Sequence, residues 1–176
     1  MVSGRTWLSS SRLPRPFASG ATAEQAAAQA LDLILQATGT TSGTIHRLSA
    51  DGTVLRLLAA RRIPPPVLAQ IQEVPLGKGM AGVAAQSRQP VTTCNLQQDD
   101  AGGVIRPGAK ATGAGGAVAV PILRGEAVLG VLGVATGEER EFTPEEIEAL
   151  LALGRELAAA WVDTDPAENS RWRTNP

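Results

Sequence analysis

Hydrophobic and polar positions along the chain change from helical to strand-like spacing in a regular order. Between residues 22 and 39, apolar side chains recur every three or four positions, which predicts an amphipathic helix. Thr22, with Gln25 three residues later, forms a capping-box pattern at its start, and Gly39 marks its end. The apolar stripe is rich in small residues, so we expect this helix to pack closely: it comprises Ala27, Ala30, Leu31, Ile34 and Leu35.

Two pairs of partly alternating apolar segments are typical of β-hairpins. Residues 44–48 and 53–60 flank a turn that contains Asp51 and Gly52, and this pair favours the positive φ of a tight hairpin. Residues 117–123 and 127–135 are joined by a three-residue turn in the same way. Two hairpins in one chain indicate an antiparallel sheet.

The segment between the hairpins predicts shorter elements. Three successive prolines, Pro64 to Pro66, end the first hairpin and can enter a helix only in its first turn. A long Gly-rich loop inside a compact domain is uncommon unless it is functional or mobile. In order, we expect a short helix at 67–72, a strand at 73–76, a helix at 79–88, a strand at 91–94 and a Gly-rich loop at 95–116.

The last helix has the strongest local start signal in the chain. Thr143 is placed to cap it, Pro144 fits its first position and Glu146 completes a capping box. Its apolar face comprises Ile147, Leu150, Leu151, Gly154, Leu157 and Trp161. Because this stripe and that of the first helix combine large and small apolar residues, we predict a homodimer formed through these two helices.

Composition sets the class of protein. The 176 residues suffice for one ordinary domain, and 43% hydrophobic with 19% charged residues is a globular balance. We assign residues 1–21 to a flexible leader, residues 22–162 to the domain and residues 163–176 to a polar tail. The leader is rich in Arg and Ser and lacks acidic residues, which leaves open whether it is a targeting segment or simply disordered.

Charge and aromatic content disfavour two kinds of partner. A net charge of −1 and only 3% aromatic residues argue against nucleic acid, which needs basic and stacking side chains. The longest apolar runs are far shorter than the roughly 20 residues of a membrane span, so no membrane association is expected. A single cysteine excludes an internal disulfide, and we therefore expect a cytoplasmic location.

Three segments carry a resemblance to a known family. They are residues 74–91 with V-P-L-G-K-G-M-A-G-V-A, residues 119–132 with A-V-P-I-L-R-G and V-L-G-V-L, and residues 142–146 with F-T-P-E-E. With the order of elements, they make most of residues 22–162 resemble a GAF domain. The resemblance implies an α+β fold: a central antiparallel sheet of about six strands has the N- and C-terminal helices on one face and a small-molecule pocket on the other.

Candidate ligand-binding residues follow from this resemblance. His46 and Arg47 fall where bilin-binding relatives have pocket-facing residues, although His46 fits equally a solvent-facing or hydrogen-bonded strand position. Arg106, with Lys110, is suited to hold an anionic ligand, or is simply solvated. The full candidate set is His46, Arg47, Met80, Cys94, Arg106, Ala117 and Ala119.

Several kinds of chemistry are disfavoured. Gly77, Gly79 and Gly82 spell G-x-G-x-x-G, but a dinucleotide site needs a parallel βαβ unit, so we interpret them as a tight turn with close packing. A single histidine removes paired-histidine metal sites. Cys94 is interpreted as a small structural residue, because free methionine sulfoxide reductases use several cysteines and bilin attachment needs one in the loop or beside a histidine.

We therefore expect a non-catalytic sensory or regulatory module. It binds a small-molecule ligand, signals through its terminal helices to a protein partner and has no identifiable cofactor or metal. The alternative is a ligand-free dimerisation or interaction module, in which Gly130, Gly133 and the Ala-rich segments leave no cavity. A redox enzyme of the free methionine sulfoxide reductase type is the less favoured third reading.

Overall fold

The computed structural model describes residues 22–98 and 110–164. Within these ranges, six strands form one antiparallel sheet in the order β3-β2-β1-β6-β5-β4. The strands are β1 (Ser42–Leu48), β2 (Val54–Arg61), β3 (Glu73–Pro75), β4 (Val91–Thr93), β5 (Ala117–Arg124) and β6 (Ala127–Ala135). The helices are α1 (Ala23–Thr38), α2 (Pro65–Gln70), α3 (Gly79–Ser87) and α5 (Pro144–Thr164).

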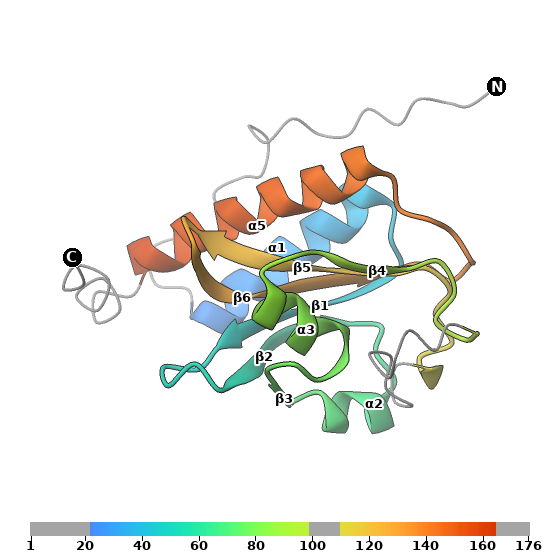
Figure 1. Ribbon diagram of the computed structural model, residues 1–176, viewed down its shortest axis with the longest axis horizontal. Coiled ribbons are helices and arrows are strands. Elements are labelled where there is room, and N and C mark those ends of the chain that lie inside the picture. The colour runs from blue at the N-terminus through green and yellow to red at the C-terminus, as the bar shows by residue number, and fades with distance from the viewer. Residues whose placement is uncertain (1–21, 99–109, 165–176) are drawn as a thin grey trace.

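The helices cover the sheet on both faces. Figure 1 shows α1 and α5 side by side on one face, with α2 and α3 on the other. The first and last helices of the chain therefore form one layer, and β1 and β6, which pair at the centre of the sheet, lie beneath it. This arrangement confirms the expected α+β fold with its two terminal helices on one face.

Both long helices begin as their sequences predict. The Thr22 hydroxyl accepts a hydrogen bond from the backbone N–H of Gln25 at 3.2 Å, and the Gln25 side-chain oxygen accepts the Thr22 N–H at 2.9 Å. Thr143 and Glu146 make the same reciprocal pair before α5, at 3.2 and 3.0 Å. Gly39 ends α1 with a φ of 63°, in the left-handed region that favours glycine.

The apolar stripes of α1 and α5 pack against the sheet. Leu31 and Ile34 of α1 and Leu150 and Leu157 of α5 are buried in one cluster with the side chains of β5 and β6. Trp161 is 2% exposed within a single chain. The apolar residues of α1 and α5 from which we predicted a homodimer are thus buried against the sheet of their own chain. A dimer formed by these two helices would therefore use the helix faces that point away from the sheet.

The two hairpins and the short elements lie close to their predicted positions. The helix predicted at 67–72 is α2 and starts two residues earlier, because Pro65 and Pro66 occupy its first turn. The register of β1 against β2 shifts between Ile45 and His46, so that Leu58 of β2 is an extra residue without a partner in β1. This bulge lies directly beside His46.

The expected leader, residues 1–21, lies outside the described residues, as does the expected tail apart from the end of α5. Among the described helices, none combines the length and apolarity needed to cross a bilayer.

Candidate functional site

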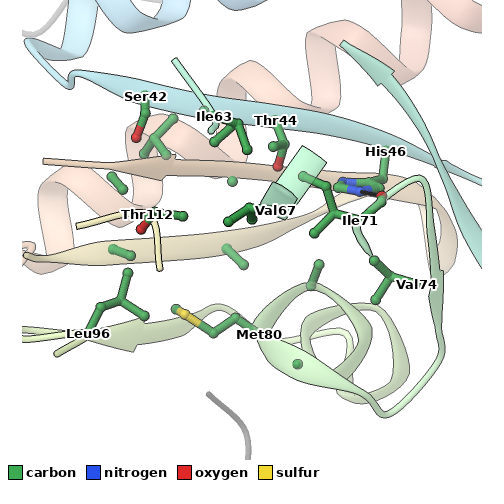
Figure 2. A pocket seen from close by; sticks show the side chains of 18 of the residues that line it. Ser42, Thr44, His46, Ile63, Val67, Ile71, Val74, Met80, Leu96 and Thr112 are labelled. Atoms are coloured by element: carbon green, nitrogen blue, oxygen red, sulfur yellow. Dashed lines mark hydrogen bonds between the residues drawn. The ribbon is translucent and has the colours of Figure 1, made fainter. Parts of the chain in front are cut away.

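A cavity of about 190 Å³ lies between the sheet and the elements that cover its second face. One wall is the face of β1, β5 and β6 opposite the α1–α5 layer, and the other is formed by α2, the start of α3 and the residues near Leu96 and Thr112. Figure 2 shows His46, Ile71 and Val74 at one end and Ser42, Thr112 and Leu96 at the other. The cavity therefore runs along the strands.

β1 supplies the polar side of the cavity. Side chains of a strand alternate between its faces, and Ser42, Thr44 and His46 share the face that lines the cavity. At about 3.3 Å of rise per residue, Ser42 and His46 are about 13 Å apart along the strand. Two hydroxyls and one imidazole are thus spaced along this wall, and Gln70 and Thr112 add polar side chains from the other wall.

Small residues on the sheet leave the space, and larger apolar side chains close it. Ala117 and Ala119 of β5, with Gly133 and Ala135 of β6, line the cavity without filling it. The opposite wall is built from Ile63, Val67, Ile71 and Met80. The Met80 side chain extends from α3 toward Leu96, against which it also packs (Figure 2).

His46 is the most deeply buried polar residue of the described lining, with only 2% of its surface exposed, against 8% for Ser42. Its Nε2 lies 2.9 Å from the backbone carbonyl oxygen of Ile71, just after α2. No polar atom of the described residues is a hydrogen-bond partner of its Nδ1, which is also buried. Burial lowers the pKa of His46, and the hydrogen bond to Ile71 opposes this only in part, so the neutral imidazole is favoured.

The cavity carries no other ionisable side chain from the part of the chain that the structure describes. Its lining there contains no lysine, arginine, aspartate or glutamate. The same residues also contain no group of three or more metal-ligating side chains of the His, Cys, Asp and Glu types. The geometry therefore suits a largely apolar, uncharged ligand and offers no metal centre within these ranges.

Four of the seven residues selected from the sequence lie in the cavity wall: His46, Met80, Ala117 and Ala119. Arg106 falls outside the described residues. That any of the four binds a ligand stays a prediction.

The other two selected residues lie elsewhere. Arg47 follows His46 directly, so its side chain points to the opposite face of the sheet, where its guanidinium lies 5.7 Å from the centre of the Trp161 ring. Cys94 is exposed and is absent from the cavity lining. Neither residue lines this cavity, and a ligand-binding role for either stays a prediction; Cys94 is exposed rather than packed as a small structural residue.

The sequence analysis did not select most of the residues in the cavity wall that faces the sheet. Val67 of α2 and Ile71, the residue that follows the helix, are four residues apart, a spacing that is visible in the sequence. Ser42 and Thr44 follow from His46 by the alternation of a strand. Leu96, in contrast, lies in a segment without periodicity, and nothing in the sequence indicates its position.

The G-x-G-x-x-G segment forms a tight connection between β3 and α3. Gly77 and Gly79 have φ values of 76° and 64°, which favour glycine. A Cβ on Gly82 would lie 2.3 Å from the carbonyl oxygen of Pro75, so α3 starts against the strand before it. These contacts confirm our interpretation of the three glycines as turn and packing residues.

An antiparallel sheet with both terminal helices on one face and a largely apolar cavity on the other defines a single-sheet α+β domain. Comparison with family models gives the family: the GAF domain family matches residues 20–162. The chain belongs to the GAF domain family. At the level of the family, it is a sensory or regulatory module. Among proteins with curated descriptions, none matches the chain.

Solved structures share the fold at low sequence identity. The GAF domain of a phosphoenolpyruvate-protein phosphotransferase from Coxiella burnetii has a TM-score of 0.68 and 19% identity, over 86% of this chain and 89% of that one. The corresponding domain from Acinetobacter has a TM-score of 0.66 and 17% identity, over 82% and 85%. A free methionine-R-sulfoxide reductase from Neisseria meningitidis, solved with its substrate, has a TM-score of 0.63 and 15% identity, over 87% and 82%.

Proposed function

We propose that this protein is a non-catalytic sensor that binds a small molecule in the cavity beneath α2 and α3. Ligand binding changes the packing of α5 and α1 on the sheet, and the changed helices act on a protein partner. The single observation that carries the proposal is the cavity itself, about 190 Å³ between the sheet and the elements that cover its second face. A ligand-free interaction module has no use for such a space, since empty volume lowers stability.

The strand β1 offers a short route from the cavity to the terminal helices. His46 lines the cavity, and the adjacent Arg47 lies over Trp161 of α5 on the other face. β6 is pressed against the same segment: a Cβ on Gly130 would lie 2.1 Å from the carbonyl oxygen of His46 and 3.1 Å from the Trp161 ring. A small shift of His46 is therefore passed to α5 by direct contact.

The cysteine content supports a non-catalytic role. The chain has one cysteine, and Cys94 is exposed and outside the cavity lining. A lone thiol oxidised by a sulfoxide cannot be resolved to a disulfide within the same chain. The purified protein should therefore show no turnover of free methionine-R-sulfoxide with a thiol reductant, and thiol-dependent turnover above a Cys94→Ser control would overturn this part of the proposal.

We also propose a homodimer formed by the outer faces of α1 and α5, acting in the cytoplasm. The support is the position of both helices together on one face of the sheet (Figure 1). A change in the packing of α5 would there act directly on a second copy of the chain. Sedimentation equilibrium should show a concentration-dependent dimer. A strict monomer at high concentration would argue against it.

Native mass spectrometry tests the central proposal. Freshly purified protein should show a reproducible non-covalent mass excess that is absent after denaturation. Met80→Trp, which places a larger side chain into the cavity, should abolish the excess, and the matched volume-conserving change Met80→Leu should retain it. A clean mass match for the natural protein, or an excess that survives Met80→Trp in a folded protein, would show that the cavity is not the binding site.

A further inference from the structure

We infer that the ligand is an uncharged, largely apolar molecule about the size of a substituted benzene ring, whose one polar group hydrogen-bonds to the hydroxyl of Thr44. The inference rests on the proposed function, because it assumes that the cavity binds a ligand. The size of the ligand, its charge and the place of its polar group each follow from a separate observation.

The cavity volume sets the size. An engineered apolar cavity of about 150 Å³ holds a benzene molecule. The cavity of about 190 Å³ therefore accepts one ring with a small substituent. Larger ligands, such as a nucleotide or a tetrapyrrole, would require the walls formed by Val67 and Met80 to move apart.

The wall chemistry sets the charge. Apart from His46, the lining formed by the described residues holds no ionisable side chain. A buried carboxylate, phosphate or ammonium group without an opposite charge is strongly disfavoured. His46 does not supply that charge: its Nε2 is bound to the carbonyl oxygen of Ile71, and its buried Nδ1 does not reach the cavity. An uncharged ligand is therefore favoured over an anion or a cation.

Thr44 keeps accessible surface although it lies in the middle of the sheet. β1 pairs with β2 on one side and with β6 on the other, so the strand has no free edge. Ile45, which points toward the terminal helices, is fully buried, whereas Thr44 is only half-buried. Because Thr44 is part of the cavity lining, its accessible surface borders the cavity.

The Thr44 hydroxyl faces an open space over Gly133 of β6. The two residues are paired across the strands, and both line the cavity. Apart from the residues adjacent to Gly133, a Cβ built on it would meet one atom within 4 Å, the Oγ1 of Thr44 at 3.1 Å. This hydroxyl makes no hydrogen bond to a described residue. A polar ligand atom that enters this space therefore finds a hydroxyl ready to pair with it.

Ser42 is the second hydroxyl of β1, and it is less suited to this role. It lies two residues from Thr44, about 7 Å along the strand, so one polar group cannot bond to both. Its cross-strand partner is Ala135, whose methyl group occupies the place that is open beside Thr44. Figure 2 shows Ser42 toward one end of the cavity and Thr44 between it and His46. The geometry therefore favours Thr44.

The chemistry of a hydroxyl sets the class of the polar group. The hydroxyl of Thr44 both donates and accepts, so it pairs with an alcohol, a phenol, or the carbonyl group of a neutral ketone or amide. A pure hydrocarbon in the same place leaves the hydroxyl unpaired, which weakens binding. Phenol represents the class, and toluene has nearly the same shape without the polar group.

A ratio of affinities measures the contribution of the Thr44 hydroxyl. The dissociation constants of toluene and phenol are measured by NMR titration on the natural protein and on Thr44→Val, which keeps the branched shape and loses the hydroxyl. We expect the ratio of toluene to phenol to fall by about 3- to 10-fold in Thr44→Val, the range that one neutral hydrogen bond supplies. Benzoate should not bind measurably to the natural protein.

Two matched substitutions serve as controls. Thr92→Val makes the same change at an exposed residue of β4 that is not part of the cavity lining. Ser42→Ala removes the other hydroxyl of β1. Both should leave the ratio of the natural protein unchanged. Toluene should still bind to every variant, which shows that the cavity is intact.

Met80 reports where the probes bind. The chain has two methionines, so the loss of one methyl signal in Met80→Leu identifies the signal of Met80. Bound phenol and toluene should both show nuclear Overhauser contacts with the Met80 methyl group, because this side chain forms part of the wall that faces the sheet.

The outcomes distinguish this inference from the proposed function. If the ratio is unchanged in Thr44→Val, if it falls as much in Ser42→Ala, or if benzoate binds beside Met80, the inference is wrong and the cavity remains a binding site. If no probe binds but native mass spectrometry detects a ligand, the inference is again wrong and the proposed function stands. If no probe binds and the mass match is clean, both fail.

Discussion

Gly130 lies where the packing of β6 against β1 leaves no room for a side chain. A Cβ built there would be 2.1 Å from the carbonyl oxygen of His46, whereas such contacts are essentially never shorter than 3.0 Å. Gly130→Ala therefore requires β1 to retreat by at least about 0.9 Å, the difference between these distances. The added methyl also approaches the Trp161 ring at 3.1 Å, so relief toward α5 is blocked.

The expected loss of stability follows from these contacts. Overpacking of this kind costs about 3 kcal/mol, and alanine recovers about 1 kcal/mol over glycine in a strand, which leaves a net loss of about 2 kcal/mol. For a domain of this size, the melting temperature should fall by about 8 °C. Urea denaturation followed by circular dichroism measures the free energy of unfolding, and a thermal melt checks it.

A matched control uses the same substitution at an open position. A Cβ on Gly137 meets no atom within 4 Å, and Gly137 is exposed, so Gly137→Ala should change the free energy of unfolding by less than about 0.5 kcal/mol. If Gly130→Ala is as stable as this control, the close approach of β1 and β6 is wrong, and with it the direct contact that we propose between the cavity and α5.

Two further perturbations test the cavity histidine and the start of α5. The folded-state pKa of His46 lies below the unfolded value of 6.5, so the unfolded chain binds the proton more readily. The stability that this histidine contributes above about pH 6.5 is therefore lost as the pH falls below that value. In urea titrations between about pH 7.5 and about pH 5.5, His46→Phe should flatten the dependence of the free energy of unfolding on pH. Thr143→Ala removes the hydroxyl that accepts the hydrogen bond of the Glu146 N–H, and it should lower the free energy of unfolding by about 1 kcal/mol. Thr143→Ser keeps a hydroxyl and should retain most of this stability. Equal losses for both variants would contradict the capping role.

Elements whose ends are defined by local chemistry could be predicted almost to the residue. The capping boxes at Thr22 and Thr143 need only residues three positions apart, and Gly39 ends α1 by its own conformational freedom. The hairpin turn at Asp51 and Gly52 is local in the same way, with a Gly52 φ of 72°. None of these features depends on how distant parts of the chain meet.

The cavity depends on long-range register and was predicted only in part. His46 and Arg47 were both selected, although adjacent strand residues point to opposite faces and only one of them can line a cavity. Which one does so follows from the pairing of β1 with β6 and from the bulge at Leu58, neither of which is written in the sequence of β1 itself. Leu96 reaches the cavity only because the sheet brings distant segments together.

This division of β1 into two faces is what we expect of a strand that links the proposed binding cavity to α5. The His46 residue lines the cavity, and the next side chain along the strand lies over Trp161. A ligand that displaced His46 would move a backbone whose carbonyl oxygen already lies close to Gly130, so the strand could not absorb the movement by sliding toward β6. We expect the displacement to be transmitted instead through Arg47 and Trp161 to the C-terminal part of α5.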